Sequence, residues 1–163
     1  MTDHYNEAFK KLMDLEGWDK ITNDPDDPGG TTKYGISKKS YPHLNIGALG
    51  LEQAKAIYYQ DYWQTVGIHR ILDKGLAIKV FCTGVVMGPF PAIRFLQMAC
   101  NVLGADLKVD GVLGPVTSAW INGYRHADAI EAAFECFASE YIFKIGSPKY
   151  IAGWLIRIDR DMT

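Results

Sequence analysis

Apolar side chains recur at three- and four-residue intervals along most of the chain, which is the spacing of amphipathic helices. In residues 4–16 this apolar face consists of Ala8, Phe9, Leu12, Met13 and Leu15. Gly17 follows that face as a stop signal. The same spacing, together with helix-capping and helix-breaking residues, predicts further helices over residues 51–63, 73–87, 91–103, 115–123, 127–145 and 148–161. The pattern therefore predicts a mainly α protein.

Residues 17–37 break this pattern, because Asp, Pro, Gly and Thr dominate them. Such a composition favours turns and loops, and the β-branched and aromatic residues at its end allow a short hairpin. We expect a short irregular or β-hairpin segment at 20–37 within an otherwise helical fold. Because a long loop in a small domain is usually functional or disordered, this segment is the first candidate for chemistry.

The composition excludes several classes of protein. A chain of 163 residues buries about two-thirds of the surface of its unfolded state, so no disulfide or metal is needed for stability. A formal net charge of -2 offers no basic field that would attract nucleic acid. Cys82, Cys100 and Cys136 are widely spaced and form no CxxC pair, so we expect reduced thiols, no metal site and no cofactor.

Two segments of the chain bear on the cellular location of the protein. Residues 1–11 are polar and lack the apolar region of a secretory signal. Residues 76–90 are interrupted by Lys79 and are too few to span a bilayer. We therefore expect a protein that is made in the cytoplasm without a signal peptide and has no membrane partner. We also expect it to be a monomer. If the substrate lies outside the cytoplasm, export must depend on another route.

Glu16 ends the first predicted helix, and the long loop begins directly after it. Aspartates follow Glu16 at eight, ten and eleven positions, threonines follow at fifteen and sixteen, and Gly35-Ile36 closes the segment. This order resembles the phage-type lysozymes, in which a Glu-Gly pair is followed by an Asp, a Thr and a Gly-Ile pair. Breaking a glycosidic bond needs an acid for the leaving oxygen and a group that activates water or stabilises the oxocarbenium ion.

The residue types in this segment fit those roles. The negative end of the helix macrodipole disfavours the charged form of Glu16, which suits a catalytic proton donor. Asp27, from the 24–27 cluster, is the predicted base or electrostatic stabiliser, and Thr32 is the predicted group that orients water. Sugars stack on aromatic planes and bind polar side chains, and the predicted substrate contacts are Trp18, Asp24, Thr31, Tyr34, Tyr62 and Trp63.

The segment LEGWDKITNDPDDPGGTTKYGIS, residues 15–37, resembles glycoside hydrolase family 108, the N-acetylmuramidases. Residues 96–123, which contain DGVLGPVT, resemble the predicted peptidoglycan-binding domain that accompanies this family. The resemblance implies a lysozyme-like fold and Glu16 as the catalytic residue. It also implies hydrolysis of the β-1,4 bond between N-acetylmuramic acid and N-acetylglucosamine in bacterial peptidoglycan glycan strands. On this basis we expect a catalytic half, 1–90, and a binding half, 91–163, to pack as one compact domain that acts at the cell wall or periplasm after release or holin-type export.

The chain departs from the family pattern at four positions. Trp18 stands where the pattern has its second glycine, and Cys82, Val86 and Ile156 replace one Asp and two Asn. Because residues 82 and 86 share a helical face, we hypothesise that apolar packing replaces a buried polar network as a whole. If the network lines the glycan cleft instead, activity is weakened or lost. The alternative function is therefore a catalytically weak or inactive peptidoglycan-binding or secretion-associated protein of the same fold.

Overall fold

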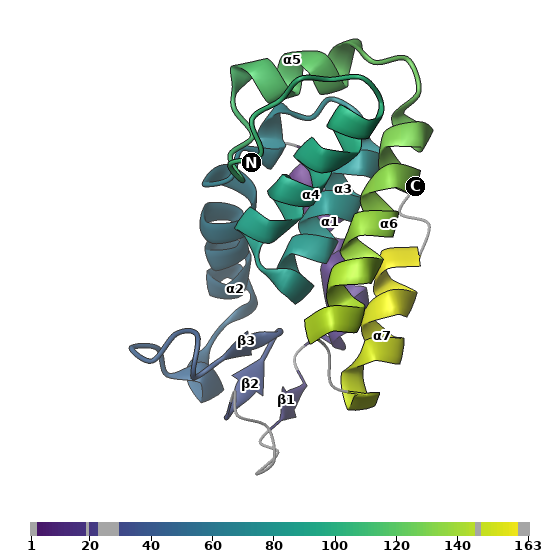
Figure 1. Ribbon diagram of the computed structural model, residues 1–163. Helices are drawn as coiled ribbons and strands as arrows, with labels where there is room; N and C mark the ends of the chain where they lie inside the picture. The colour runs from purple at the N-terminus through teal and green to yellow at the C-terminus, as the bar shows by residue number, and fades with distance from the viewer. Residues whose placement is uncertain (1–2, 19, 23–29, 146–147, 160–163) are drawn as a thin grey trace.

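The computed structural model describes residues 3–18, 20–22, 30–145 and 148–159 (Figure 1). Most of this part of the chain is helical, in the order α1 (Asp3–Glu16), α2 (Leu51–Tyr58), α3 (Lys74–Met87), α4 (Pro89–Val102), α5 (Pro115–Gly123), α6 (Ala127–Ile145) and α7 (Pro148–Asp159). A small sheet lies at one end of the helical body and α5 lies at the other (Figure 1). The expected mainly α, lysozyme-like fold is confirmed.

Local side chains set the boundaries of the helices. Asp73 caps α3, because its Oδ1 accepts a 2.8 Å hydrogen bond from the Leu76 amide. Gly88 ends α3 with a φ of +95°. Helix α4 begins at Pro89 rather than at the predicted residue 91, because a proline is tolerated in the first turn of a helix.

The helix predicted over residues 51–63 is regular only as far as Tyr58. It continues as a π-helix, η2 (Tyr59–Gln64), in which the Thr65 amide donates to the Gln60 carbonyl at 3.1 Å. The Thr65 hydroxyl donates to the same carbonyl at 2.6 Å. Turns of π-helix are rare in proteins, and those that occur are often found near functional sites. Two short 3-10 helices, η1 (Ile46–Ala48) and η3 (Ile68–Arg70), lie in segments for which no element was predicted.

The predicted hairpin segment forms a three-stranded antiparallel sheet of β1 (Ile21–Thr22), β2 (Thr32–Lys33) and β3 (Ile36–Ser37). Thr32 lies opposite Thr22 on one side and Ser37 on the other. Because directly opposed residues share a face, these three hydroxyls point to the same face of the sheet. Ile36, on the alternate face, is buried in the core.

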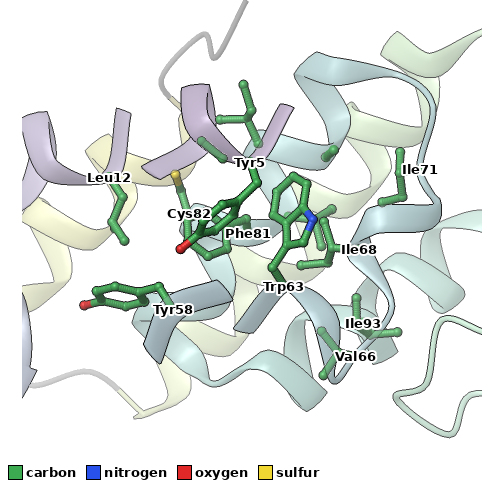
Figure 2. Packing of buried hydrophobic residues seen from close by; sticks show 14 of the residues in the cluster. Tyr5, Leu12, Tyr58, Trp63, Val66, Ile68, Ile71, Phe81, Cys82 and Ile93 are labelled. Atoms are coloured by element: carbon green, nitrogen blue, oxygen red, sulfur yellow. The ribbon is translucent and has the colours of Figure 1, made fainter. Parts of the chain in front are cut away.

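The core is centred on α3, whose residues are nearly all buried. Three aromatic rings from different elements meet beside it, with centroid distances of 5.4 Å for Tyr5–Trp63, 5.6 Å for Trp63–Phe81 and 5.9 Å for Tyr5–Phe81 (Figure 2). Large aromatic side chains dominate the energetics of such cores, and edge-to-face pairs add to the free energy of burial. The helical body is therefore a rigid support for the sheet.

Gln97 fixes the Asp110-Gly111 turn that was associated with peptidoglycan binding. The buried Gln97 amide donates to Asp110 Oδ1 at 3.0 Å and to the Val112 carbonyl at 3.1 Å, and its Oε1 accepts from the Gly111 amide at 2.9 Å. Gly111 has a φ of +83°, which favours glycine. The Asp-Gly pair thus has a structural role in this turn.

The structure buries two of the three residues to which the hypothesis of wholesale apolar replacement applies. Cys82 is buried in the main core, and Val86 packs against the smaller apolar cluster between α4, α6 and α7. Ile156 is 64% exposed, so it takes no part in buried packing and that part of the hypothesis is wrong.

Cys82 and Cys100 are buried and Cys136 is exposed, and none of these three described cysteines forms a disulfide. Burial raises the pKa of Cys100 to about 12, so this thiol is unreactive near neutral pH. In the described ranges we find no cluster of His, Cys, Asp or Glu arranged to hold a metal ion. No helix within the same ranges has the length and apolarity needed to cross a membrane.

Lys79 joins three helices through its buried ammonium group. This α3 side chain is 1% exposed and donates to Glu135 Oε1 of α6 at 2.5 Å and to the Ile158 carbonyl of α7 at 2.6 Å. Glu131 Oε1 of α6 lies 3.2 Å from the same nitrogen. A buried charge of this kind is tolerated only when its partners are in place.

We predict that Lys79→Met lowers the free energy of unfolding by about 3 kcal/mol, because two carboxylates lose their cation and a carbonyl its donor. Urea denaturation measures the change. Lys74→Met is the matched control, because Lys74 forms an exposed 2.9 Å pair with Glu7 that contributes at most about 1 kcal/mol. Equal losses in the two variants would contradict the structural role of Lys79.

Candidate active site

Glu16 is the last residue of α1, and its side chain is half-buried. The helix ends there because the Gly17 and Trp18 amides both donate to the Met13 carbonyl, at 3.0 and 3.1 Å. Gly17 has a φ of +81°, as expected for the residue that turns the chain out of a helix. Its predicted role as a stop is confirmed, and Glu16 lies where the helix meets the sheet segment.

Trp18 has a φ of +56°, a left-handed conformation that costs a non-glycine residue about 1–2 kcal/mol. Its indole Nε1 donates to Asp14 Oδ1 at 3.0 Å, one helical turn back along α1. The side chain is 41% exposed. The backbone therefore keeps a glycine-like conformation at this position while presenting an aromatic ring next to Glu16 in the chain.

The turn between β2 and β3 consists of Tyr34 and Gly35, with φ values of +53° and +75°. Two successive residues with positive φ are typical of the tight hairpin turn that suits the twist of antiparallel strands. A Cβ on Gly35 would lie 3.0 Å from Glu16 Cδ and 2.6 Å from the Tyr58 hydroxyl oxygen. The carboxyl group of Glu16 therefore packs directly on the Gly35 backbone, where no side chain fits.

Tyr58 also contacts this turn, next to Glu16. Its hydroxyl donates to the Tyr34 carbonyl at 3.0 Å, and its ring is buried in the core. Neither Tyr58 nor Gly35 was predicted as a site residue. The Tyr-Gly pair before Ile36 was the available signal for Gly35, because glycine favours such turns, whereas nothing local in the sequence singles out Tyr58.

The two predicted threonines lie on or beside β2. Thr32 donates its hydroxyl to the Gly30 carbonyl at 3.3 Å and lies on the hydroxyl-bearing face of the sheet. Thr31 contributes to a hollow of about 370 Å³ whose other lining residues are Lys38, His43, Leu44, Asn45, Ile46 and Gly47. The hollow is therefore adjacent to the sheet and does not include Glu16 among its described lining residues. Asp24 and Asp27 lie outside the described residues, so their roles stay predictions.

The site just described lies within a region that matches a known family. Residues 9–88 match the family model Glycosyl hydrolase 108. This match covers just under half of the chain, so residues 9–88 are similar to the glycosyl hydrolase 108 family. It supports a glycoside hydrolase and, at the level of substrate class, implies peptidoglycan hydrolysis.

A solved structure, described as the structure of Brucella abortus SagA, is similar to the whole chain. The TM-score is 0.80 with 22% sequence identity, over 97% of this chain and 91% of that chain. At this identity the likeness shows the fold alone. Comparison with curated proteins gave no match to the chain.

Two of the predicted sugar contacts in the glycosyl hydrolase 108 region are covered by the fold. Trp63 is 1% exposed and packs among core aromatic rings, because the apolar face of its helix points inward. Tyr34 is 8% exposed, and the Lys33 ammonium lies 5.1 Å from its ring centroid. Both rings are thus buried in this structure, and sugar contacts by Trp63 and Tyr34 stay predictions that their burial does not favour.

Tyr62 lies at the edge of the glycosyl hydrolase 108 region's core and is half-buried. Burial raises its pKa, and the nearby Asp61 carboxylate raises it further. Tyr41 donates to Asp61 Oδ2 at 2.7 Å, and burial together with this hydrogen bond raises the pKa of Tyr41. Both phenols therefore remain neutral near physiological pH, and a sugar contact by Tyr62 remains a prediction.

We predict that Trp18→Gly is more stable than Trp18→Ala by about 1 kcal/mol, because only glycine adopts the left-handed backbone without strain. Thermal or urea unfolding of the two variants measures the difference. The same pair at Trp120, inside α5, is the control, and there the alanine variant is expected to be more stable by about 1 kcal/mol. The same order at both positions would contradict the strain assigned to Trp18.

Proposed function

We propose that this protein is an N-acetylmuramidase that cleaves the β-1,4 bond between N-acetylmuramic acid and N-acetylglucosamine, with Glu16 as its general acid. The observation that carries the proposal is the packing of the Glu16 carboxyl group against Gly35, inside the region that matches the glycosyl hydrolase family. A carboxylic acid held at a helix end by a tight turn has a defined direction for proton transfer.

In the proposed reaction Glu16 donates its proton to the glycosidic oxygen as the bond to the anomeric carbon breaks. Positive charge develops on the sugar ring, and a water molecule supplies the hydroxyl group that completes hydrolysis. Thr32 is proposed to orient this water, because its hydroxyl is on a polar face of the sheet with Thr22 and Ser37. Asp27 is proposed to receive the proton of the water or to stabilise the charged ring.

We propose in addition that residues 91–163 contribute to wall binding. The proposal rests on the resemblance of residues 96–123 to a peptidoglycan-binding domain and on a hollow of about 420 Å³ in the same half. Residues lining this hollow come from both sides of the Gln97-held turn and include Asp106, Lys108, Val112 and Thr117. Since Asp110 is engaged by Gln97, the neighbouring residues are the better candidates for a direct contact with the wall.

We predict that Glu16→Gln lowers the release of reducing ends from purified peptidoglycan by at least about 100-fold, since the amide has no acidic proton to donate. The assay is reducing-end formation, with wall pelleting as a measure of binding. Glu7→Gln is the matched control on the exposed part of α1 and is expected to keep full activity. A wild-type protein that binds walls but releases no reducing ends would favour the alternative, a binding or secretion-associated protein without catalysis.

The identity of the cleaved bond is tested separately by mass analysis of the released fragments. A muramidase leaves N-acetylmuramic acid at the new reducing end. Fragments that end in reducing N-acetylglucosamine would contradict the proposed bond, although the chain would still be a glycoside hydrolase.

A further inference from the structure

We propose that Tyr58 is a positioning residue for Glu16, acting through the Tyr34-Gly35 turn. The inference rests on the proposed function, because it concerns how the acid is held for proton transfer. Three observations support it: the Tyr58 hydroxyl donates to the Tyr34 carbonyl at 3.0 Å, the turn residue Gly35 touches both side chains, and Tyr58 is buried. Tyr58 is proposed to act through this turn and not by contact with the sugar.

The turn needs such a support because of its first residue. Asn-Gly, Asp-Gly and Gly-Gly are the favoured pairs in a tight hairpin turn with two positive φ values. Here the first position is Tyr34, a bulky residue with a φ of +53°. An unfavourable backbone conformation persists only when surrounding contacts over-determine it. The Tyr58 hydroxyl is a long-range contact of this kind, from a residue 24 positions away in the chain.

The position of the Tyr58 hydroxyl is in turn fixed by the core. Its ring lies 6.1 Å from Phe9 of α1, 6.2 Å from Phe81 of α3 and 5.3 Å from Tyr62 of the π-helix, centroid to centroid. Figure 2 shows this ring among side chains that come from different helices. Movement of the ring would therefore require repacking of several elements at once.

The link to Glu16 is the close approach at Gly35. The position that a Cβ would occupy on Gly35 is 2.6 Å from the Tyr58 hydroxyl and 3.0 Å from Glu16 Cδ, so both groups bound the same small space. If the turn relaxes, the carboxyl group loses the surface against which it packs. A displacement of about 1 Å in a catalytic group can lower the rate about 100-fold.

Tyr58→Phe is the first test, assayed with soluble, un-cross-linked peptidoglycan strands. We expect kcat to fall about 10- to 100-fold while KM changes less than about threefold, because orientation rather than binding is lost. Tyr5→Phe is the matched control: the Tyr5 hydroxyl also donates to a distant carbonyl, that of Lys55, from the same core. It is expected to lower the thermal midpoint about as much as Tyr58→Phe while leaving kcat unchanged.

A double-mutant cycle with Gly35→Ala separates positioning from general destabilisation. The added methyl group would collide with both Glu16 and the Tyr58 hydroxyl, so kcat should fall in the single variant. Because both substitutions act on one contact, the combined variant should lose far less activity than the product of the two single losses. Independent, multiplying losses would overturn the proposal.

Two further results distinguish the proposed role of Tyr58 from the proposed muramidase activity. Equal kcat in Tyr58→Phe and Tyr5→Phe, with an active wild-type protein, would overturn the role of Tyr58 and leave the muramidase proposal standing. No hydrolysis by the wild-type protein would overturn both, since no proton transfer would then exist for Tyr58 to support.

Discussion

The contact between the Glu16 carboxyl group and the Gly35 backbone is the constraint on which the proposed active site depends. It brings together the end of a helix and a turn that is nineteen residues further along the chain. Only glycine fits at this point, because any side chain would meet both Glu16 and Tyr58. The helix supplies the acid, the sheet supplies the surface, and the core supplies the hydroxyl that fixes the turn.

Backbone strain in the described chain is concentrated at this site. The two non-glycine residues with positive φ in the described ranges are Trp18 and Tyr34, one beside Glu16 in sequence and one beside Gly35. Strained conformations of this kind tend to cluster at functional sites, where the surrounding fold maintains them. Here the surrounding fold includes a buried aromatic core and a buried lysine that ties α3 to α6 and α7. The rigid core thus supports the strained backbone of the site at the edge of the molecule.

Features that depend on local spacing could be predicted from the sequence. The helical periodicity, the Asp73 cap and the Gly17 stop all follow from residues within one or two turns of each other, and all are confirmed. Features that depend on distant contacts could not be predicted. The packing of Gly35 on Glu16 and the Tyr58 hydrogen bond join segments that only the fold brings together, and the π-helix departs from regular spacing. Trp63 shows the same limit, because helical periodicity does not distinguish a buried aromatic residue from one that borders a groove.

The most direct test of the central claim is a crystal structure of the Glu16→Gln variant with a peptidoglycan glycan fragment bound. We expect the substituted side chain to lie within hydrogen-bond distance of the glycosidic oxygen to be cleaved, with Gly35 still packed against it. A fragment bound with its glycosidic oxygens out of reach of position 16, for example in the hollow lined by Asp106, Lys108 and Thr117, would contradict the role of Glu16 as the acid.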